Sequence, residues 1–501
     1  MKIHKKSLIF LLIAILLIVA FLLQGGYFAL AEEGKHPLDG AEQESAFEAG
    51  QGTLWHGEVF APFVDITAWV TNKKYSLGGS LDLARVYKDT GVLYYNLGFI
   101  AYNRLNAFTN GAYGKMLNWC FGGYPELSEQ SKSRQYQGIK SSIKSIREQG
   151  GDIALSIGGG VEGSNFFQRT QDITILRNTY LDIVNGFGLT RLDLDIEGSG
   201  QNEDGNIANA KAIKQVQELT GVQITLTLPA GPNGLSNLGL QVLDAYLLQG
   251  VELTVVNAMA MCYGTKTLEN GESYGAAAVR AGENVKAQLQ AHYLAKREIV
   301  LSEEEAYAKV GTTISIGYQS ASFPIFTPEW AKLMYDWAKS NKIGMLSFWS
   351  LNRDSKTQAN KGVAKQYEFT SIYKEYTAVK VTFQTSGGSG LEPVLLPYGA
   401  AGAELPAPSK EGAIFSGWFI DKELSIPVST FTENQTIYAK WVSNISEQEP
   451  QMPTEALLPS QNEPAIESAK TPLIIYIISI LFMIAPFWLA KILKGIKALS
   501  F

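Results

Sequence analysis

Short apolar runs alternate with stretches of helical periodicity between Glu58 and Tyr376. The runs that predict strands are Phe63–Trp69, Val92–Ala101, Asp152–Ile157, Thr190–Glu197, Gln223–Leu228, Leu253–Met261, Thr312–Gly317 and Gly344–Ser350. Between them, Tyr136–Gly150 and Thr327–Asn341 have helical spacing, and Thr327 is an expected N-cap followed by a proline in the first turn. This alternation predicts an α/β fold, a (β/α)8 TIM barrel, with a doubly wound sheet as the competing architecture.

The fourth predicted strand carries three acidic side chains on one face. In TRLDLDIEGSG (190–200), Asp193, Asp195 and Glu197 alternate with Leu and Ile. Successive side chains of a strand point to opposite faces, so the three carboxylates share one face and the apolar residues pack on the other. A calcium site is the alternative interpretation, although hard cations usually take their oxygen ligands from a turning loop.

Other strand ends add side chains to the same rim of the predicted barrel. Met261 and Tyr263 follow the sixth strand, and Trp349 lies near the end of the eighth. In a barrel the active site forms at the carboxyl ends of the strands. The stretch GGGVEG (158–163) satisfies the dinucleotide pattern G-x-G-x-x-G, but no helix clearly opens at its last glycine, which disfavours a nucleotide site.

Both ends of the chain carry long apolar stretches. Residues 1–31 have a basic start, an apolar run and a small-residue cleavage site, which is the layout of a signal peptide, with an uncleaved anchor as the alternative. Residues 473–490 contain no charge and precede three lysines, a pattern typical of a C-terminal transmembrane helix with a cytoplasmic tail. Residues 442–470 are rich in Glu, Pro, Ser, Gln and Asn and predict a disordered linker.

These ends predict an exported protein on the surface of a bacterium of the Gram-positive type, anchored in the plasma membrane by the C-terminal helix. The net charge of −6, without a basic stripe, argues against nucleic acid as a partner. The four histidines are scattered and form no metal-ligand cluster with the two cysteines, so we expect no metal and no cofactor. Cys120 and Cys262 allow one disulfide without implying it.

Four motifs, in order along the chain, resemble those of the family 18 glycoside hydrolases, the chitinase family. LDLDIE (192–197) resembles the D-x-x-D-x-D-x-E signature, and LSIGGG (155–160) resembles the S-x-G-G strand. VNAMAMCYG (256–264) resembles V-N-x-M-x-M-D-Y-G, and LSFWSLNRD (346–354) resembles F-W-S-x-N-R-D. APFVDITAW (61–69) is similar to the first strand of one bacterial branch. The resemblance implies a catalytic TIM barrel over residues 58–376.

The resemblance also implies catalytic roles. Glu197 matches the general acid, Asp195 the carboxylate that orients the substrate's N-acetyl group, and Asp193 the carboxylate behind it. Tyr263 matches a tyrosine that hydrogen-bonds the same acetamido group. In this family the substrate's acetamido oxygen is the nucleophile, which implies retaining hydrolysis of β-1,4-linked N-acetylglucosamine polymers or oligomers.

The implied substrate-binding residues are Trp349, as the floor of the −1 sugar site, together with Met259, Met261 and Cys262. Cys262 stands where the matching pattern has Asp, and a thiol cannot supply a carboxylate's charge, so lowered turnover is expected. Two further departures are Thr190, in place of the first Asp of the long signature, and the Gln-Ser pair at 319–320, in place of a polar N-D pair.

Residues 379–441 resemble the Listeria–Bacteroides surface B-repeat, a small β-grasp-like module that we expect to act as a spacer or, less simply, as a binding module. The leading hypothesis for the whole chain is a surface chitinase acting on chitin or other N-acetylglucosamine-containing glycans. An endo-β-N-acetylglucosaminidase acting on N-glycans would need the same fourth-strand motif. A glycan-binding surface lectin that has lost turnover is the third alternative, disfavoured by Glu197 and favoured modestly by Cys262.

Overall fold

The computed structural model describes residues 49–443, except 56, 106, 356–360, 378, 397–399, 402–404 and 432–434. The predicted signal peptide, the predicted membrane span at 473–490 and nearly all of the predicted linker lie outside these residues. Within the described part of the chain, none of the helices combines the length and the apolar character needed to cross a bilayer.

A closed barrel of parallel strands forms the centre of the larger domain. Around the barrel the order is β2, β5, β9, β10, β11, β13, β14 and β15, and pairing of Trp349 with Phe63 closes the ring. The strands span Phe63–Asp65, Tyr94–Tyr102, Asp152–Gly158, Arg191–Asp195, Gln223–Gly231, Leu253–Ala260, Val310–Ser315 and Met345–Trp349. Closure confirms the predicted (β/α)8 barrel and excludes the doubly wound sheet, which has two open edges.

The first strand differs from its predicted bounds. It is split into β1 (Val59–Phe60) and β2, both of which pair with β15 in one continuous register across Pro62. The strand then ends at Asp65 instead of running on to residue 69. The carboxylate of Asp65 accepts bonds from the backbone N–H and the hydroxyl of Thr67, and such a local bond favours a turn over a strand.

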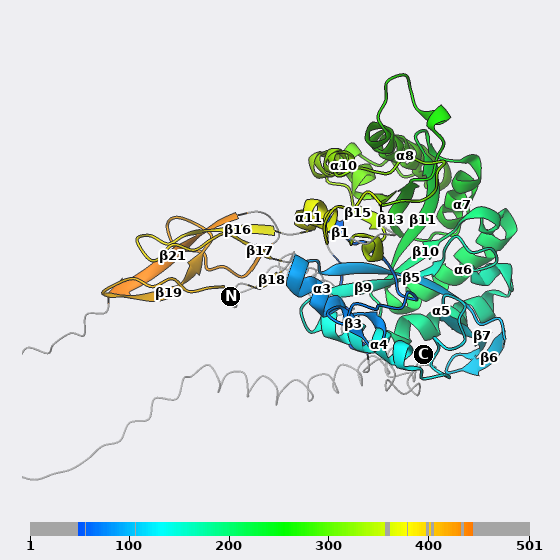
Figure 1. Ribbon diagram of the computed structural model, residues 1–501, viewed down its shortest axis with the longest axis horizontal. Helices are drawn as coiled ribbons and strands as arrows, with labels where there is room; N and C mark the ends of the chain where they lie inside the picture. Colours follow the sequence, from blue (N-terminus) through cyan, green and yellow to red (C-terminus); the bar gives the residue numbers. More distant parts are fainter. Residues whose placement is uncertain are drawn as a thin grey trace, which may run out of the picture. The chain divides into compact units, whose positions relative to one another are not determined.

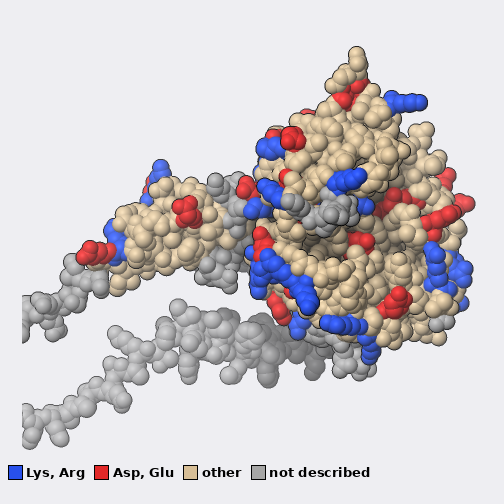
Figure 2. Space-filling model, viewed as in Figure 1, with Lys and Arg blue, Asp and Glu red and all other residues tan. Residues whose placement is uncertain are grey.

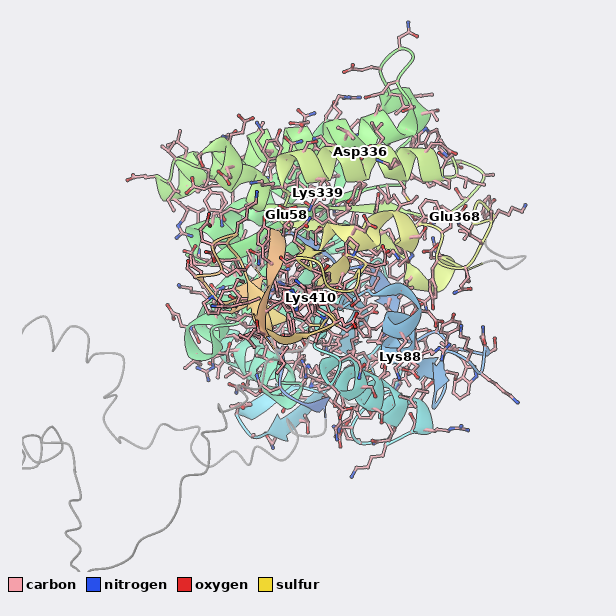
Figure 3. All side chains as sticks on the ribbon, turned by 90° about the vertical axis from the view of Figure 1, so that its left-hand side faces the viewer. Glu58, Lys88, Asp336, Lys339, Glu368 and Lys410 are labelled. Carbon is pink, nitrogen blue, oxygen red and sulfur yellow. The ribbon has the colours of Figure 1, made fainter. Side chains whose placement is uncertain are left out.

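Helices cover the outside of the barrel (Figure 1). They are α3 (Leu83–Thr90), α4 (Arg134–Arg147), α5 (Ile173–Gly186), α6 (Glu203–Thr220), α7 (Asn237–Leu248), α8 (Tyr274–Arg297), α9 (Glu303–Ala308), α10 (Pro328–Asn341) and α11 (Thr370–Tyr373). The Thr327 hydroxyl caps α10 by accepting from the Trp330 N–H, as predicted. In Figure 3, Lys339 of α10 lies beside Glu58, and their 3.3 Å ion pair ties α10 to the chain just before β1.

Smaller elements decorate the loops of the barrel. The short strands are β3 (Ser76–Leu77), β4 (Ser80–Leu81), β6 (Phe108–Gly111), β7 (Gly114–Leu117), β8 (Trp119–Phe121) and β12 (Gly234–Leu235). Single 3-10 turns are η1 (Phe166–Gln168), η2 (Gly198–Gly200), η3 (Thr265–Thr267), η4 (Leu351–Arg353) and η5 (Lys374–Tyr376). On the face drawn in Figure 2, side chains of both charges are interspersed, and uncharged residues cover most of the described surface.

The C-terminal module is a separate small β structure. Its strands are β16 (Val379–Gln384), β17 (Val394–Leu396), β18 (Ala400–Ala401), β19 (Ala413–Phe419), β20 (Thr430–Phe431) and β21 (Gln435–Ser443). The first and last long strands, β16 and β21, pair in parallel, while β17 and β19 flank them in antiparallel pairing. Val381, Phe383, Trp418 and Ile437 are buried together in its core, which agrees with the predicted compact β module.

A buried ion pair closes the amino-terminal end of the barrel. Arg147 at the end of α4 lies 2.7 Å from Asp152 at the start of β9, and both side chains are at least 95% buried. The second oxygen of Asp152 accepts from the Trp55 indole and the Thr190 hydroxyl. This ion pair therefore fixes the chain that precedes β1 beneath the barrel.

We predict that Asp152→Ala destabilises the fold by about 3–5 kcal/mol, because it leaves the Arg147 charge buried without its partner. Guanidinium unfolding of the purified protein measures the change. The control is Asp336→Ala, which removes the carboxylate of an exposed pair with Lys332 on α10 (Asp336 is labelled in Figure 3) and should cost less than about 1 kcal/mol. Equal losses in the two variants would contradict the importance of the buried pair.

Candidate active site

The carboxyl end of β10 holds the three acidic residues singled out from the sequence. Asp193 and Asp195 point into the barrel, while Leu192 and Leu194 are buried on the opposite face of the strand. Glu197 follows the strand with extended backbone, at φ −120° and ψ 162°. The alternation of side chains therefore continues past the end of the strand and brings Glu197 to the same side as the two aspartates.

A pocket of about 260 Å³ lies at this end of the barrel. Its lining is Phe63, Phe99, Gly160, Asp195, Glu197, Met259, Met261, Cys262, Thr313, Gln319 and Trp349. Of the predicted site residues, the pocket brings together two carboxylates, both methionines, the cysteine and the tryptophan. Asp193 lies deeper in the barrel, and Tyr263 is not part of the lining.

Asp193 is fully buried and hydrogen-bonded on both carboxylate oxygens. The Ser156 hydroxyl donates to Oδ2 at 2.5 Å, and the Thr227 hydroxyl donates to Oδ1 at 2.6 Å. Burial raises the pKa of Asp193 to about 6, against the opposing effects of the two hydroxyls and of Arg191. Asp193 is therefore mostly ionised at neutral pH but becomes protonated in mildly acidic solution.

Asp195 and Glu197 form a hydrogen-bonded carboxyl pair. Burial raises the pKa of Asp195 well above its usual range, with further contributions from the negative charges of Glu197 and Asp193. Burial also raises the pKa of Glu197. Two carboxyl groups in contact cannot both ionise easily, so the pair retains a shared proton. Among the described residues, nothing hydrogen-bonds to the buried Oδ1 of Asp195, although Asp195 as a residue lines the pocket.

Glycines at the end of β9 and just after it make room for this pair. A Cβ on Gly158, whose φ is +112°, would stand 2.1 Å from the backbone oxygen of Asp195. A Cβ on Gly160 would stand 3.3 Å from Oε1 of Glu197. The run GGG at 158–160 thus permits close approach to the end of β10, which accounts for the glycine pattern without a nucleotide.

Aromatic rings form one wall of the pocket. Trp349, at the end of β15, stacks on Phe99 with ring centres 5.4 Å apart and an interplanar angle of 20°. A second pocket, of about 330 Å³, shares Phe99 and Trp349 and continues towards Asp65, Tyr102, Arg104 and Tyr124. Phe99 was missed by the sequence reasoning, although its place near the end of the second barrel strand could have suggested it.

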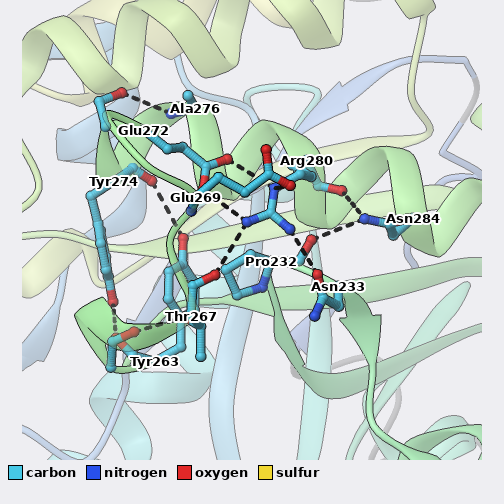
Figure 4. Close-up of polar contacts among 12 residues, drawn as sticks. Pro232, Asn233, Tyr263, Thr267, Glu269, Glu272, Tyr274, Ala276, Arg280 and Asn284 are labelled. Carbon is cyan, nitrogen blue, oxygen red and sulfur yellow. Dashed lines mark hydrogen bonds and ion pairs between the residues drawn. The ribbon is translucent and has the colours of Figure 1, made fainter.

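Tyr263 does not face the pocket as its predicted role requires. Its hydroxyl donates to the backbone oxygen of Tyr274 at 3.3 Å, the Tyr274 hydroxyl donates back to the Tyr263 oxygen at 3.0 Å, and the two rings stack (Figure 4). The reason is the left-handed conformation of Cys262, with φ 56°, just after β13 ends at Ala260. That turn breaks the alternation of side chains, so Met261 and Cys262 line the pocket and Tyr263 packs against α8 instead.

An arginine clasp holds the loop between β13 and α8. Arg280 of α8 binds both carboxylate oxygens of Glu272 at 2.8 Å and the amide oxygen of Asn233 at 2.7 Å, as Figure 4 shows. It also donates to the backbone oxygen of Thr267 at 3.2 Å. Bidentate pairing of this kind fixes orientation, so the clasp steadies the loop that begins at Cys262.

The two cysteines are free thiols, and the bridge that the sequence allowed is absent. Cys120 is buried in β8, and burial raises its pKa to about 12. Cys262 is exposed at the pocket. Partial desolvation of its thiol raises the pKa of Cys262, and this effect outweighs the positive charge of Arg353, which lowers it. The thiol at 262 is therefore neutral at pH 7. Among the residues that the structure describes, no three His, Cys, Asp or Glu side chains are grouped so as to hold a metal ion.

A closed parallel barrel with a proton-sharing carboxyl pair and an aromatic wall at the carboxyl ends of its strands has the layout of a glycoside hydrolase. Comparison with known proteins leads to one family of that class. The chain is 30% identical over 343 residues to the "Probable bifunctional chitinase/lysozyme" of Escherichia coli (strain K12), covering 64% of this chain and 35% of that protein. It is 31% identical over 311 residues to "Endochitinase 11" of Metarhizium anisopliae, covering 60% of this chain and 53% of that protein.

A solved structure agrees with these relatives. The catalytic domain of a hyperthermophilic chitinase from Pyrococcus furiosus matches with a TM-score of 0.53 and 25% identity, covering 65% of this chain and 97% of that domain. Residues 380–440 match the family model of the Listeria-Bacteroides repeat domain. These findings confirm the resemblance to the family 18 chitinases and to the repeat, and they support a glycoside hydrolase of family 18. The chain spans only about a third to a half of the length of the two curated relatives.

The exposure of the two thiols can be tested by alkylation. We predict that the native protein takes up one label, on Cys262, and that the denatured protein takes up two, because Cys120 is fully buried. Intact-protein mass spectrometry at pH 8.5 measures the count, and Cys262→Ala should remove the native label. Labelling that requires prior reduction would instead indicate a disulfide.

Proposed function

We propose that the barrel hydrolyses β-1,4-linked N-acetylglucosamine chains, as a chitinase, by a retaining, substrate-assisted reaction. The observation that carries the proposal is the carboxyl pair of Asp195 and Glu197, whose raised pKa values favour a shared proton, in a pocket that is also lined by Phe99 and Trp349. The names of the similar proteins, which are chitinases, support the same substrate class.

In the proposed reaction Glu197 donates its proton to the glycosidic oxygen, and the bond from that oxygen to C1 breaks. The acetamido oxygen of the same sugar forms a bond to C1, and the carboxylate of Asp195 accepts the acetamido N–H, which stabilises the positive charge that develops. Water then attacks C1 and gives a proton to Glu197, while the bond from C1 to the acetamido oxygen breaks and the neutral acetamido group re-forms, so the product keeps the β-configuration. Trp349 supplies an apolar face for the C–H surface of the sugar ring.

A binding protein with little turnover is the second candidate, and Cys262 favours it. A neutral thiol occupies the pocket wall where the family pattern has a carboxylate, so one group that would stabilise the developing positive charge is missing. The same pocket would serve an endo-β-N-acetylglucosaminidase, so the assay includes a high-mannose glycoprotein beside chitin oligomers.

We predict that Glu197→Gln retains binding of chitin oligomers but loses about 10²–10⁴-fold in hydrolysis, because the amide cannot donate the proton. Product release measured by chromatography, with binding followed by calorimetry, tests this. Glu203→Gln, in the exposed first turn of α6, is the matched control and should hydrolyse at the parental rate. A parent protein that binds the oligomers without cleaving them would favour the lectin. Equal cleavage by parent and Glu197→Gln would remove Glu197 as the acid.

We also propose that the protein is exported and held at the cell surface by its C-terminal apolar stretch, 473–490. The charge-free stretch followed by lysines and the repeat at 380–440 support this location. Ending the chain before Pro472 should release the protein to the medium, which immunoblotting of cells and medium would detect. Deleting 379–441 instead should leave it with the cells; release by that deletion would make the repeat the anchor.

A further inference from the structure

A chain of hydrogen bonds leads from Asp193 across the inside of the barrel. The Thr227 hydroxyl of β11 lies 2.6 Å from Asp193 Oδ1 and 3.0 Å from the amide nitrogen of Asn257 on β13. The amide oxygen of Asn257 lies 2.9 Å from the hydroxyl of Thr313 on β14. The chain thus crosses four neighbouring strands, and its last member lines the pocket.

The chemistry of the groups fixes the direction of every bond. An ionised carboxylate only accepts, so Thr227 must donate its proton to Asp193. The Thr227 oxygen then accepts from the amide N–H of Asn257, and the amide oxygen accepts from Thr313. All three donors therefore point towards Asp193, and bonds aligned in this way polarise one another and strengthen together.

All four side chains are at least 99% buried, so water cannot replace a lost partner. Two other titratable groups lie near Asp193: Arg191, two residues before it, and Asp195, two residues after it, both on β10. The remaining contact is the Ser156 hydroxyl of β9 on the other carboxylate oxygen. The three-residue chain is thus the only support that Asp193 receives, within the described structure, from the β11 side of the barrel.

We propose that Thr227, Asn257 and Thr313 act as positioning residues, forming a one-way relay that holds Asp193 oriented and ionised. This deepens the proposed hydrolase function and rests on it where catalysis is concerned. The ionised Asp193 raises the pKa of Asp195 through its negative charge. Keeping Asp193 ionised therefore keeps the shared proton on the pair of Asp195 and Glu197, where the reaction uses it.

The test measures the pKa of Asp193 itself, which does not depend on turnover. The purified protein is labelled with ¹³C at the aspartate carboxyl groups, and their resonances are followed by NMR as the pH is changed. The resonance that is missing from Asp193→Asn belongs to Asp193. Thr227→Val should raise this pKa by about one unit, because the charge-assisted bond that it removes favours the ionised form. Asn257→Leu should raise it less and Thr313→Val least, while Thr227→Ser should restore the parental value.

Thr225→Val is the matched control. Thr225 lies on the same inward face of β11, directly opposite Asp193 in the strand register, and is equally buried, but its hydroxyl has no hydrogen-bond partner in the described structure. This variant should leave the pKa of Asp193 unchanged. If Thr227→Val and Thr225→Val titrate alike, the relay is overturned. If Thr227→Val does not fold, the relay is tested by comparing Asn257→Leu with Thr227→Ser. The pKa of Asp193 should rise in Asn257→Leu and keep its parental value in Thr227→Ser, and equal values in the two would overturn the relay.

Hydrolysis of chitin oligomers provides the second readout. The acid limb of kcat/KM should move to higher pH in the order Thr227→Val, Asn257→Leu, Thr313→Val, since protonation of Asp193 then begins at higher pH. A purely structural role would lower the melting temperature without moving this limb, and that result would overturn the relay. If the parent protein does not hydrolyse chitin oligomers, the proposed function is wrong. The NMR titration of Asp193 would still show whether the relay exists, because it does not depend on turnover.

Discussion

The burial of carboxylates inside the barrel is the constraint on which the site depends. A lone ionised carboxylate in an apolar interior is strongly unfavourable, so it must be hydrogen-bonded or neutralised. The barrel uses both solutions on one strand. Asp193 keeps its charge because hydroxyls from β9 and β11 hold both oxygens, whereas Asp195 shares a proton with Glu197. Two neighbouring inward positions on one strand therefore hold a proton with different strength, Asp195 more strongly than Asp193.

This division explains why the interior contains hydroxyl and amide side chains where barrels commonly carry branched apolar residues. Ser156, Thr227 and Asn257 are fully buried and are used as donors around Asp193. The apolar residues of the same strands point outward to the helices, as Leu192 and Leu194 do. The polar interior and the apolar outer layer follow from one alternation of side chains, and that alternation also delivers Glu197 to the rim.

The alternation was visible in the sequence, so the barrel, the acidic face of β10 and the place of Trp349 could all be predicted. The errors fall where a local conformation ends the alternation. The match to a tyrosine of the family pattern predicts that Tyr263 reaches the acetamido group, but the left-handed backbone at Cys262 turns its side chain towards α8. Positive φ at a non-glycine residue has no strong sequence signal. Phe99 was within a predicted strand, but its stacking on Trp349 depends on which strands meet when the barrel closes.

The pocket wall opposite the carboxyl pair carries the main departure from the family pattern. The charge of Arg353 acts on Cys262, and Nη1 of Arg353 is buried without a hydrogen-bond partner in the described structure. The pattern's carboxylate at 262 would offset that positive charge, whereas a neutral thiol does not. In the proposed reaction, the positive charge that develops on the sugar would therefore face one negative group fewer. The proposed acid, Glu197, and the proposed acceptor, Asp195, remain, so the substitution would change the rate of the proposed reaction and leave its course unchanged.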